Sequence, residues 1–283
     1  MNGVMFKKSF LKKTAKAAAF ALSAAMVFTL FACGSGSDSG SGTTSDSDAG
    51  TEKEKYVVAT EATYPPFEST EEDGTLVGVD VELMNAIAED QGFEIEWVNM
   101  AFDSLFPALK AGNADIVTAA VSSNPERAEN ADFSDGYYES GSCIMVTSDS
   151  KYDSIDDLDG TVKIACQIGT TIQENTQALV DEGKGGEVVA LDTFSTSVMQ
   201  LKNGDVQAVA SENIVIDQYM AENDGFKKIG TIPNVSGSDD TFRFAVNKGN
   251  TELLDKINKG LADIVESGKY DEIMKKYGLE GMY

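Results

Sequence analysis

The sequence predicts an α/β protein whose two lobes enclose a cleft, and three observations support this prediction. Short apolar strands alternate with amphipathic helices over residues 56–283, a pattern typical of parallel sheets covered by helices on both faces. The alternation runs through two similar units, and the second begins near Cys143. One strand and two helices then follow the second unit. We therefore expect one lobe from residues 56–141 and 239–283 and another from residues 142–238, with a hinge where the chain crosses twice.

The first unit contains three predicted strands and two predicted helices. The strands lie at 56–59, 94–98 and 115–121, and the last is an apolar run without periodicity, as buried parallel strands show. Apolar residues at helical spacing predict a helix over 79–90, which Gly92 ends. A second helix is predicted over 104–110, with a proline in its first turn, where no amide partner is lost.

The second unit contains five predicted strands and three predicted helices. The strands lie at 143–147, 162–166, 187–191, 206–210 and 228–232, and the helices at 172–182, 196–203 and 214–222. A strand at 242–246 and helices at 252–267 and 270–277 close the chain. Ligands of open α/β sheets bind beyond the carboxyl ends of the strands, so the loops at those ends are where functional residues are expected.

The N-terminal residues have the features of a bacterial export signal. Five lysines precede an apolar run at 17–31 that is too short and too rich in alanine for a comfortable membrane span. The sequence Leu-Phe-Ala-Cys at 30–33 matches a lipobox, whose cysteine thiol is acylated before cleavage. We predict a lipoprotein signal peptide at 1–32 and lipidation of Cys33; the alternative is an ordinary signal peptide with an incidental cysteine. Residues 33–55 are predicted to be a disordered tether that holds the folded body at the extracytoplasmic face of the cell membrane.

The composition excludes several classes of function. The chain has 22 basic and 47 acidic residues and a formal net charge of −25, which argues against binding to nucleic acid and leaves the lipid anchor as the only membrane contact. It has no histidine, which excludes Ser-His-Asp and Cys-His catalysis and histidine-based zinc sites. We expect no metal, no cofactor and no catalytic residues. Cys143 and Cys166 either form a disulfide or remain two buried thiols.

Loops of the first unit carry candidate binding residues. Tyr64 offers a flat apolar face with a polar tip, which suits stacking on a small ligand, or it packs on its own lobe. Phe102 either forms a pocket wall or acts as a hydrophobic staple of the next helix. Arg127 carries a planar fork of donors that matches a carboxylate, and Ser122 adds a hydroxyl nearby. An arginine at a helix start also commonly forms a surface ion pair.

The second unit offers complementary groups. Thr170 and Thr171 start a helix and form a corner suited to an anion, although their spacing alone favours a plain helix N-cap. Glu212 ends a strand and starts a helix, where it is either a counter-ion for an ammonium group or a favourable acid at a helix N-terminus. Together these residues match the two ends of a zwitterion: an arginine and amides for a carboxylate, an acid for an ammonium group, and an aromatic lid.

Several motifs occur in order along the body. They are ATYPPFE at 62–68, GTLVGVD at 74–80, LFPALKAG at 105–112, PER at 125–127, FS at 133–134, YYESG at 137–141, GTT at 169–171 and SGKY at 267–270. In these motifs the chain resembles the polar amino-acid substrate-binding proteins of ABC importers, solute-binding family 3, over residues 56–277. The resemblance implies a periplasmic-binding-protein-like fold, with two α/β lobes joined by a two-strand hinge. Such a protein, a monomer, closes on an amino acid and docks on a membrane permease.

The resemblance also implies roles for the candidate residues in the first lobe. Tyr64 would stack on the ligand, and Phe102 would form the opposing wall. Arg127 would clamp the α-carboxylate with help from Ser122. Glu61 matches the position that often contacts the ligand side chain, although the family more commonly has aspartate there.

In the second lobe, the backbone amide at Thr171 would help to hold the α-carboxylate, beside Thr170. Glu212 matches the acid that pairs with the α-ammonium group, and it is one methylene longer than the usual aspartate. Ala119 and Ala120, across the cleft, stand where some members have serine. These departures bear on which amino acid is bound rather than on the class of ligand.

Two acids near the expected pocket, Glu61 and Glu212, favour a ligand with a basic or amide side chain. One alternative is an enzyme on the same fold, such as a dehydratase, that uses one of these acids as general acid. Another alternative is an amino-acid sensor that acts through a separate signalling partner. A neighbouring permease gene would favour import over sensing.

Overall fold

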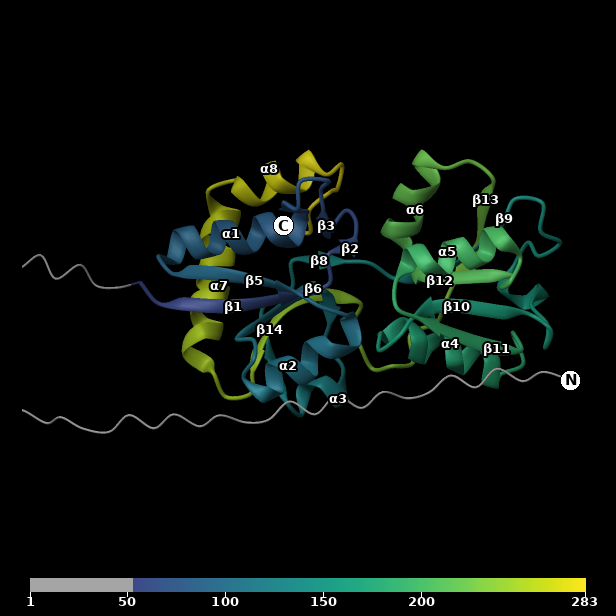
Figure 1. The fold of residues 1–283 in the computed structure, drawn as a ribbon, viewed down its shortest axis with the longest axis horizontal. Coiled ribbons are helices and arrows are strands. Elements are labelled where there is room, and N and C mark those ends of the chain that lie inside the picture. The colour runs from purple at the N-terminus through teal and green to yellow at the C-terminus, as the bar shows by residue number, and fades with distance from the viewer. Residues whose placement is uncertain (1–52) are drawn as a thin grey trace, which may run out of the picture. The chain divides into compact units, whose positions relative to one another are not determined.

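The computed structural model describes residues 53–283 (Figure 1). The predicted signal peptide at 1–32, the lipidation of Cys33 and nearly all of the predicted tether lie outside the described residues. Within 53–283, none of the helices combines the length and the apolar character that crossing a membrane requires.

A six-stranded sheet forms the centre of the first lobe. Its order is β5-β1-β6-β14-β7, with β8 also paired to β14. The strands are β1 (Lys55–Thr60), β5 (Glu94–Asn99), β6 (Ile116–Ser122), β7 (Ala131–Phe133), β8 (Tyr138–Glu139) and β14 (Thr241–Asn247). We use "first lobe" for this sheet, the helices that cover it and the small sheet β2 (Thr63–Tyr64), β3 (Glu68–Thr70) and β4 (Leu76–Val77).

The helices of the first lobe cover both faces of its sheet (Figure 1). They are α1 (Val79–Gln91), α2 (Leu105–Ala111), α3 (Pro125–Ala128), α7 (Thr251–Glu266) and α8 (Lys269–Lys276). Successive side chains of a strand point to opposite faces. Accordingly Val58 of β1 packs in one cluster with residues of α1, α7 and α8, whereas Ala59 packs in another with residues of α2. Both faces are therefore apolar, which explains the continuous apolar run of β6.

The second lobe repeats this plan with a five-stranded sheet of order β11-β10-β12-β9-β13. Its elements are β9 (Ser142–Thr147), β10 (Lys163–Gln167), α4 (Thr171–Asp181), β11 (Glu187–Leu191), α5 (Phe194–Asn203), β12 (Ala208–Glu212), α6 (Asn213–Glu222) and β13 (Phe226–Thr231). Side chains of α4 pack on one face of the sheet, and those of α5 and α6 on the other. The predicted lobe boundaries at 141/142 and 238/239 lie in the connections β8–β9 and β13–β14.

The parallel pairing predicted for the first unit is confirmed, and that expected for the second unit is wrong at its first strand. β1, β5 and β6 are parallel, as are β10, β11 and β12, but β14 is antiparallel to its neighbours and β9 is antiparallel to β12 and β13. β9 and β14 are the strands through which the chain enters one lobe from the other. No helical crossover within one sheet precedes either strand, so the rule that makes βαβ units parallel does not apply to them.

The predicted long elements match those observed to within two residues at each end, and the short ones were missed. The small sheet β2–β4, the strands β7 and β8 and the helix α3 have only two to four residues each. Such lengths carry no readable periodicity. Cys143 and Cys166 are free and buried, so of the two alternatives the structure has the buried thiols.

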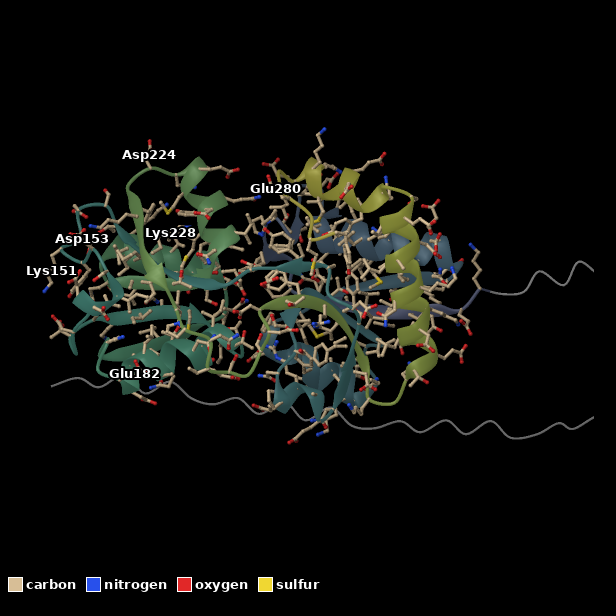
Figure 2. All side chains as sticks on the ribbon, turned by 180° about the vertical axis from the view of Figure 1, so that it is seen from behind. Lys151, Asp153, Glu182, Asp224, Lys228 and Glu280 are labelled. Carbon is tan, nitrogen blue, oxygen red and sulfur yellow. The ribbon has the colours of Figure 1, made fainter. Side chains whose placement is uncertain are left out.

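Charged side chains line the outer surface of the second lobe. Lys151, Asp153 and Glu182 point outward at the end of this lobe away from the first lobe (Figure 2). Lys151 pairs with Asp159 at 3.7 Å, and the side chains of both are at least half exposed. Exposed pairs of this kind contribute little to stability because water screens them, and they offer no site for a ligand.

Candidate ligand-binding site

A cavity of about 10 Å³, with room for about one water molecule, lies between the two lobes. We call it the inner cavity. Its lining residues come from both lobes and are Tyr64, Glu68, Phe102, Ala119, Ala120, Ser122, Arg127, Gln167, Thr170, Thr171 and Glu212. Ser122, Gln167 and Glu212 are the last residues of β6, β10 and β12. The cavity therefore lies at the carboxyl ends of the strands, where open α/β sheets bind ligands.

Arg127 is the one basic residue in this lining. Its guanidinium donates to the carbonyl oxygen of Ser122 at 2.7 Å and, across the cleft, to that of Gly169 at 3.0 Å. It also lies 4.8 Å from the ring centroid of Phe106, a favourable cation–π distance. Among residues 53–283 it forms no ion pair. Burial lowers the pKa of Arg127 to about 10, so it stays charged at neutral pH, and the N–H donors not used by the protein can hold a carboxylate.

Glu212 presents a carboxyl group to the cavity from the second lobe. It is the N-cap residue of α6, and its Oε2 accepts a hydrogen bond from the hydroxyl of Ser211 at 3.4 Å. Burial raises the pKa of Glu212 to about 8, because a low-dielectric environment disfavours the charged form. Glu212 has no ion-pair partner within residues 53–283 either. An ammonium group in the cavity would supply one.

Two aromatic residues form walls of the cavity. Tyr64 is buried, and its hydroxyl shares a hydrogen bond with that of Ser211 in the second lobe at 2.8 Å. Its ring also meets that of Phe194 edge-on, at 6.3 Å between centroids. Phe102 is buried as well, and Arg127 lies 5.6 Å from the centroid of its ring. The side chain of Tyr64 therefore contacts both lobes.

Thr170 and Thr171 line the cavity, and Thr170 also caps a helix. The hydroxyl of Thr170 accepts from the backbone N–H of Gln173 at 3.1 Å and donates to the carbonyl oxygen of Gln167 at 2.8 Å. Thr170 is thus the N-cap of α4, and Thr171 is the first residue of that helix. Because the hydroxyl of Thr170 is committed to the cap, the unpaired backbone N–H groups of this helix start are the donors left for an anion.

Glu68 and Gln167 line the cavity but were not among the candidate residues. Glu68 is 1 % exposed, and its Oε2 has no hydrogen-bond partner within the described residues. It reaches the cavity because β2 and β3 pair Tyr64 with Glu68 across a tight turn. The sequence feature that could have indicated Glu68 is that this acid directly follows Phe67 and lies four residues after the candidate Tyr64. Alternation was unreadable there, since the strands have two and three residues.

Glu61 is buried next to the cavity but is not part of its lining. One carboxylate oxygen accepts from the hydroxyl of Thr63, and the other accepts from Nε2 of Gln167 in the second lobe at 3.1 Å. Burial raises the pKa of Glu61, and these two hydrogen bonds oppose the shift. In this structure the side chain joins the two lobes rather than facing the inner cavity.

The two lobes are held together around the cavity by polar contacts. Besides the bonds from Tyr64, Glu61 and Arg127, the amide of Asn124 donates to Glu174 at 3.3 Å. Each of these contacts joins a residue of one lobe to a residue of the other. Within residues 53–283, no group of three or more Cys, Asp or Glu residues is placed to hold a metal ion.

The chain is similar to known amino-acid-binding proteins. It is 35 % identical to the arginine-binding extracellular protein ArtP of Bacillus subtilis over 258 residues, 90 % of this chain and 95 % of the relative. A probable histidine-binding protein of Neisseria gonorrhoeae is 33 % identical over 222 residues, 78 % of this chain and 82 % of the relative. A solved structure, an ancestral arginine-binding protein bound to arginine, matches with a TM-score of 0.73 and 38 % identity, over 80 % of this chain and 99 % of that one.

Residues 56–280 match the family described as bacterial extracellular solute-binding proteins, family 3. The match spans both lobes and includes every residue of the inner cavity. The relatives named above are binding proteins rather than enzymes. The two-lobed fold, the cavity between the lobes and this match lead to one conclusion. The chain belongs to the bacterial extracellular solute-binding proteins, family 3.

Proposed function

We propose that this protein binds a free amino acid with a positively charged side chain between its lobes and delivers it to an ABC importer. The observation that carries the proposal is that the cavity holds a guanidinium and a carboxyl group, on opposite lobes, that have no ion-pair partner within residues 53–283. The carboxylate of an amino acid would pair with Arg127 and its ammonium group with Glu212. A pair of buried opposite charges is favourable when both are hydrogen-bonded.

The preference for a basic side chain rests on the rest of the lining. With its charged ends held by Arg127 and Glu212, the ligand would meet Glu68, an acid with an unused oxygen. An unpaired carboxyl group in a buried site favours a cation over an apolar side chain. The names of relatives that bind arginine or histidine support the same class.

A thermal-shift screen against the twenty common amino acids, with ornithine and cystine added, tests this proposal. Ligands that bind the folded state raise the melting temperature. We expect arginine, lysine, ornithine or histidine to give the largest shift and aspartate and glutamate to give none. A largest shift with an acidic or an apolar amino acid would contradict the proposal. Isothermal titration calorimetry on the best ligand then gives the dissociation constant and a stoichiometry, expected to be one.

Anchoring at the extracytoplasmic face through lipidated Cys33, and a monomeric body, belong to the same proposal. The acidic surface argues against attachment to anionic lipid without an anchor. Metabolic labelling with a tritiated fatty acid should mark the wild-type chain and leave Cys33→Ser unmarked. Labelling of the Cys33→Ser variant would contradict the assignment. Size-exclusion chromatography with light scattering checks the monomer.

We further propose that the protein catalyses no reaction on its ligand. The cavity offers Glu68 and Glu212 as acids of raised pKa, so an acid-catalysed elimination is the reaction to test. Incubation of the protein with prephenate-like acids, followed by chromatography, should give no product above the uncatalysed rate. Product formation that disappears in Glu212→Gln would contradict the proposal.

A further inference from the structure

Glu68 lies next to a second buried acid, Asp80. Asp80 is in the first turn of α1 and is fully buried. Its carboxylate accepts from the backbone N–H of Ala120 at 2.8 Å and from the hydroxyl of Tyr137 at 2.7 and 2.8 Å. The backbone N–H of Asp80 donates to the carbonyl oxygen of Phe67, the residue before Glu68, at 2.9 Å, so the two acids lie close together. Two buried carboxyl groups this close cannot both ionise without a counter-charge, so the pair carries at least one proton.

The surroundings place this proton on Glu68. Asp80 receives N–H and O–H donors, which stabilise its charged form against burial; its pKa is raised to about 7. Glu68 receives no such donors, and burial and the neighbouring charge of Asp80 raise its pKa well above the ordinary value. Two carboxylates this close cannot both ionise without a counter-charge. Glu68 is therefore the acid and Asp80 the base of the pair.

No positive charge in the described part of the chain pairs with these two acids. The ionisable groups that face it are Glu61 from the segment after β1, Tyr137 before β8 and Tyr270 of α8, whose hydroxyl donates to the carbonyl oxygen of Tyr137. Tyr64, the cross-strand neighbour of Glu68, is the nearest phenol in the cavity lining. Among residues 53–283, no lysine or arginine forms an ion pair with Glu68 or Asp80. We therefore expect a counter-charge to come from the ligand.

We propose that the Glu68–Asp80 pair holds one shared proton in the ligand-free protein and releases it to solvent when a positively charged side chain enters the inner cavity. The cation takes the place of the proton: the O–H bond of Glu68 breaks, the proton leaves to water, and the carboxylate pairs with the ligand. A neutral side chain, such as that of glutamine, leaves the proton in place. Selection between charged and neutral side chains is then coupled to pH. This inference rests on the proposed function.

The coupling has a definite sign. Protons and the cationic side chain compete for one site, so acid weakens binding of the cation. The affinity for arginine should rise with pH by up to tenfold per pH unit, until the pair of the ligand-free protein ionises by itself. Binding of glutamine should lack this contribution. Glu212 also gives up a proton when it pairs with an α-ammonium group, but every amino acid has that group, so the difference between the two ligands isolates the Glu68–Asp80 pair.

Isothermal titration calorimetry of the full mature chain counts the protons. Arginine and glutamine are each titrated at about pH 7 in phosphate and in Tris, whose ionisation enthalpies differ widely. The dependence of the observed enthalpy on the buffer gives the number of protons released. We expect arginine to release about one proton more than glutamine. In Glu68→Gln, which keeps the shape of the side chain and cannot ionise, we expect weaker arginine binding and no difference between the two ligands.

Glu126→Gln is the matched control, because Glu126 is an exposed acid of the same lobe outside the inner cavity. It should keep the difference of about one proton. Equal proton release for both ligands in the wild-type protein would overturn the proton exchange while leaving the proposed function intact. Failure of arginine to bind at all would overturn the proposed ligand class and this inference with it. If Glu68→Gln does not fold, the wild-type comparison still decides.

Discussion

The sharpest test of the site is Arg127→Ala. The substitution removes the guanidinium that would hold the ligand carboxylate, its hydrogen bond to the carbonyl oxygen of Gly169 across the cleft and its stacking on Phe106. Removing one partner of a buried, hydrogen-bonded charge pair costs about 3–5 kcal/mol, because the remaining charge is left without a partner. About 1.4 kcal/mol corresponds to a tenfold change in the dissociation constant, so this constant should rise by roughly two to nearly four orders of magnitude.

Isothermal titration calorimetry with the best amino-acid ligand measures this change. Arg243→Ala is the matched control, because Arg243 also lies in the first lobe, is part-buried and pairs with Asp239, but is not part of the inner cavity. It should bind with a dissociation constant within about threefold of the wild-type value, as expected for a residue without ligand contact. Arg127→Lys keeps the charge but loses the planar fork, so an intermediate loss is expected. A folded Arg127→Ala protein that binds as tightly as Arg243→Ala would refute the assignment.

Three further predictions follow from single residues. Glu61→Ala should weaken arginine and glutamine binding by the same factor, about tenfold or more, because Glu61 accepts a hydrogen bond from Gln167 of the other lobe and does not line the cavity. A loss of affinity for arginine alone, measured by calorimetry, would contradict this. Gly78→Ala should prevent stable folding, because Gly78 has a φ of 134° and an added Cβ would lie 2.0 Å from the carbonyl oxygen of Phe67. Gly74→Ala is the control: a Cβ added there would have no atom within 4 Å, so the free energy of unfolding in urea should fall by only about 1 kcal/mol. The folded-state pKa of Glu212 is about 8, above its unfolded value, so the folded protein holds the proton more tightly and the stability that this group contributes is lost as pH rises toward 8. In urea unfolding of the ligand-free protein, Glu212→Gln should therefore show a smaller fall in the free energy of unfolding over that range. An unchanged fall would count against the burial of this carboxyl group.

Much of the fold could be predicted from the sequence because long elements carry periodic signals. The helix α7 and the strand β6 have enough residues for their apolar faces to be read directly. The direction of β9 and β14 could not be predicted, because direction depends on which sheet a strand joins, and the chain changes lobes at these strands. Local sequence does not encode that choice.

For the site, strand ends were informative and short hairpins were not. Arg127 and Glu212 were chosen because they follow β6 and end β12, and both line the cavity. Glu68 was missed, and Glu61 was expected to contact the ligand side chain, although the two acids are seven residues apart in one segment. Which of them faces the cavity is decided by the pairing of Tyr64 with Glu68 and by the bond from Gln167 of the other lobe to Glu61. Both are tertiary contacts, and the first also fixes which face of the hairpin is buried.

The wall opposite the second lobe shows why Asp80 is buried without a cation. Ala120 lines the inner cavity with a φ of 46°, a conformation that costs a non-glycine residue about 1–3 kcal/mol. The carboxylate of Asp80 accepts a hydrogen bond from the N–H of Ala120 and another from the hydroxyl of Tyr137. Tyr270 of α8 in turn donates to the backbone of Tyr137. The C-terminal helix is thereby linked through hydrogen bonds to the cavity wall.

This chain of hydrogen bonds gives the charged form of Asp80 a structural role that is independent of the ligand. Because Asp80 is needed as an acceptor for Ala120, the proton that two adjacent carboxyl groups must hold is left to Glu68. The strained backbone of Ala120, the charged form of Asp80 and the proposed proton on Glu68 are therefore linked by one set of contacts. Replacing the acceptor at Asp80 would release the wall and redistribute the proton together, so the two effects cannot be separated by substitution at that residue, whereas substitution at Glu68 leaves the acceptor of the Ala120 N–H in place.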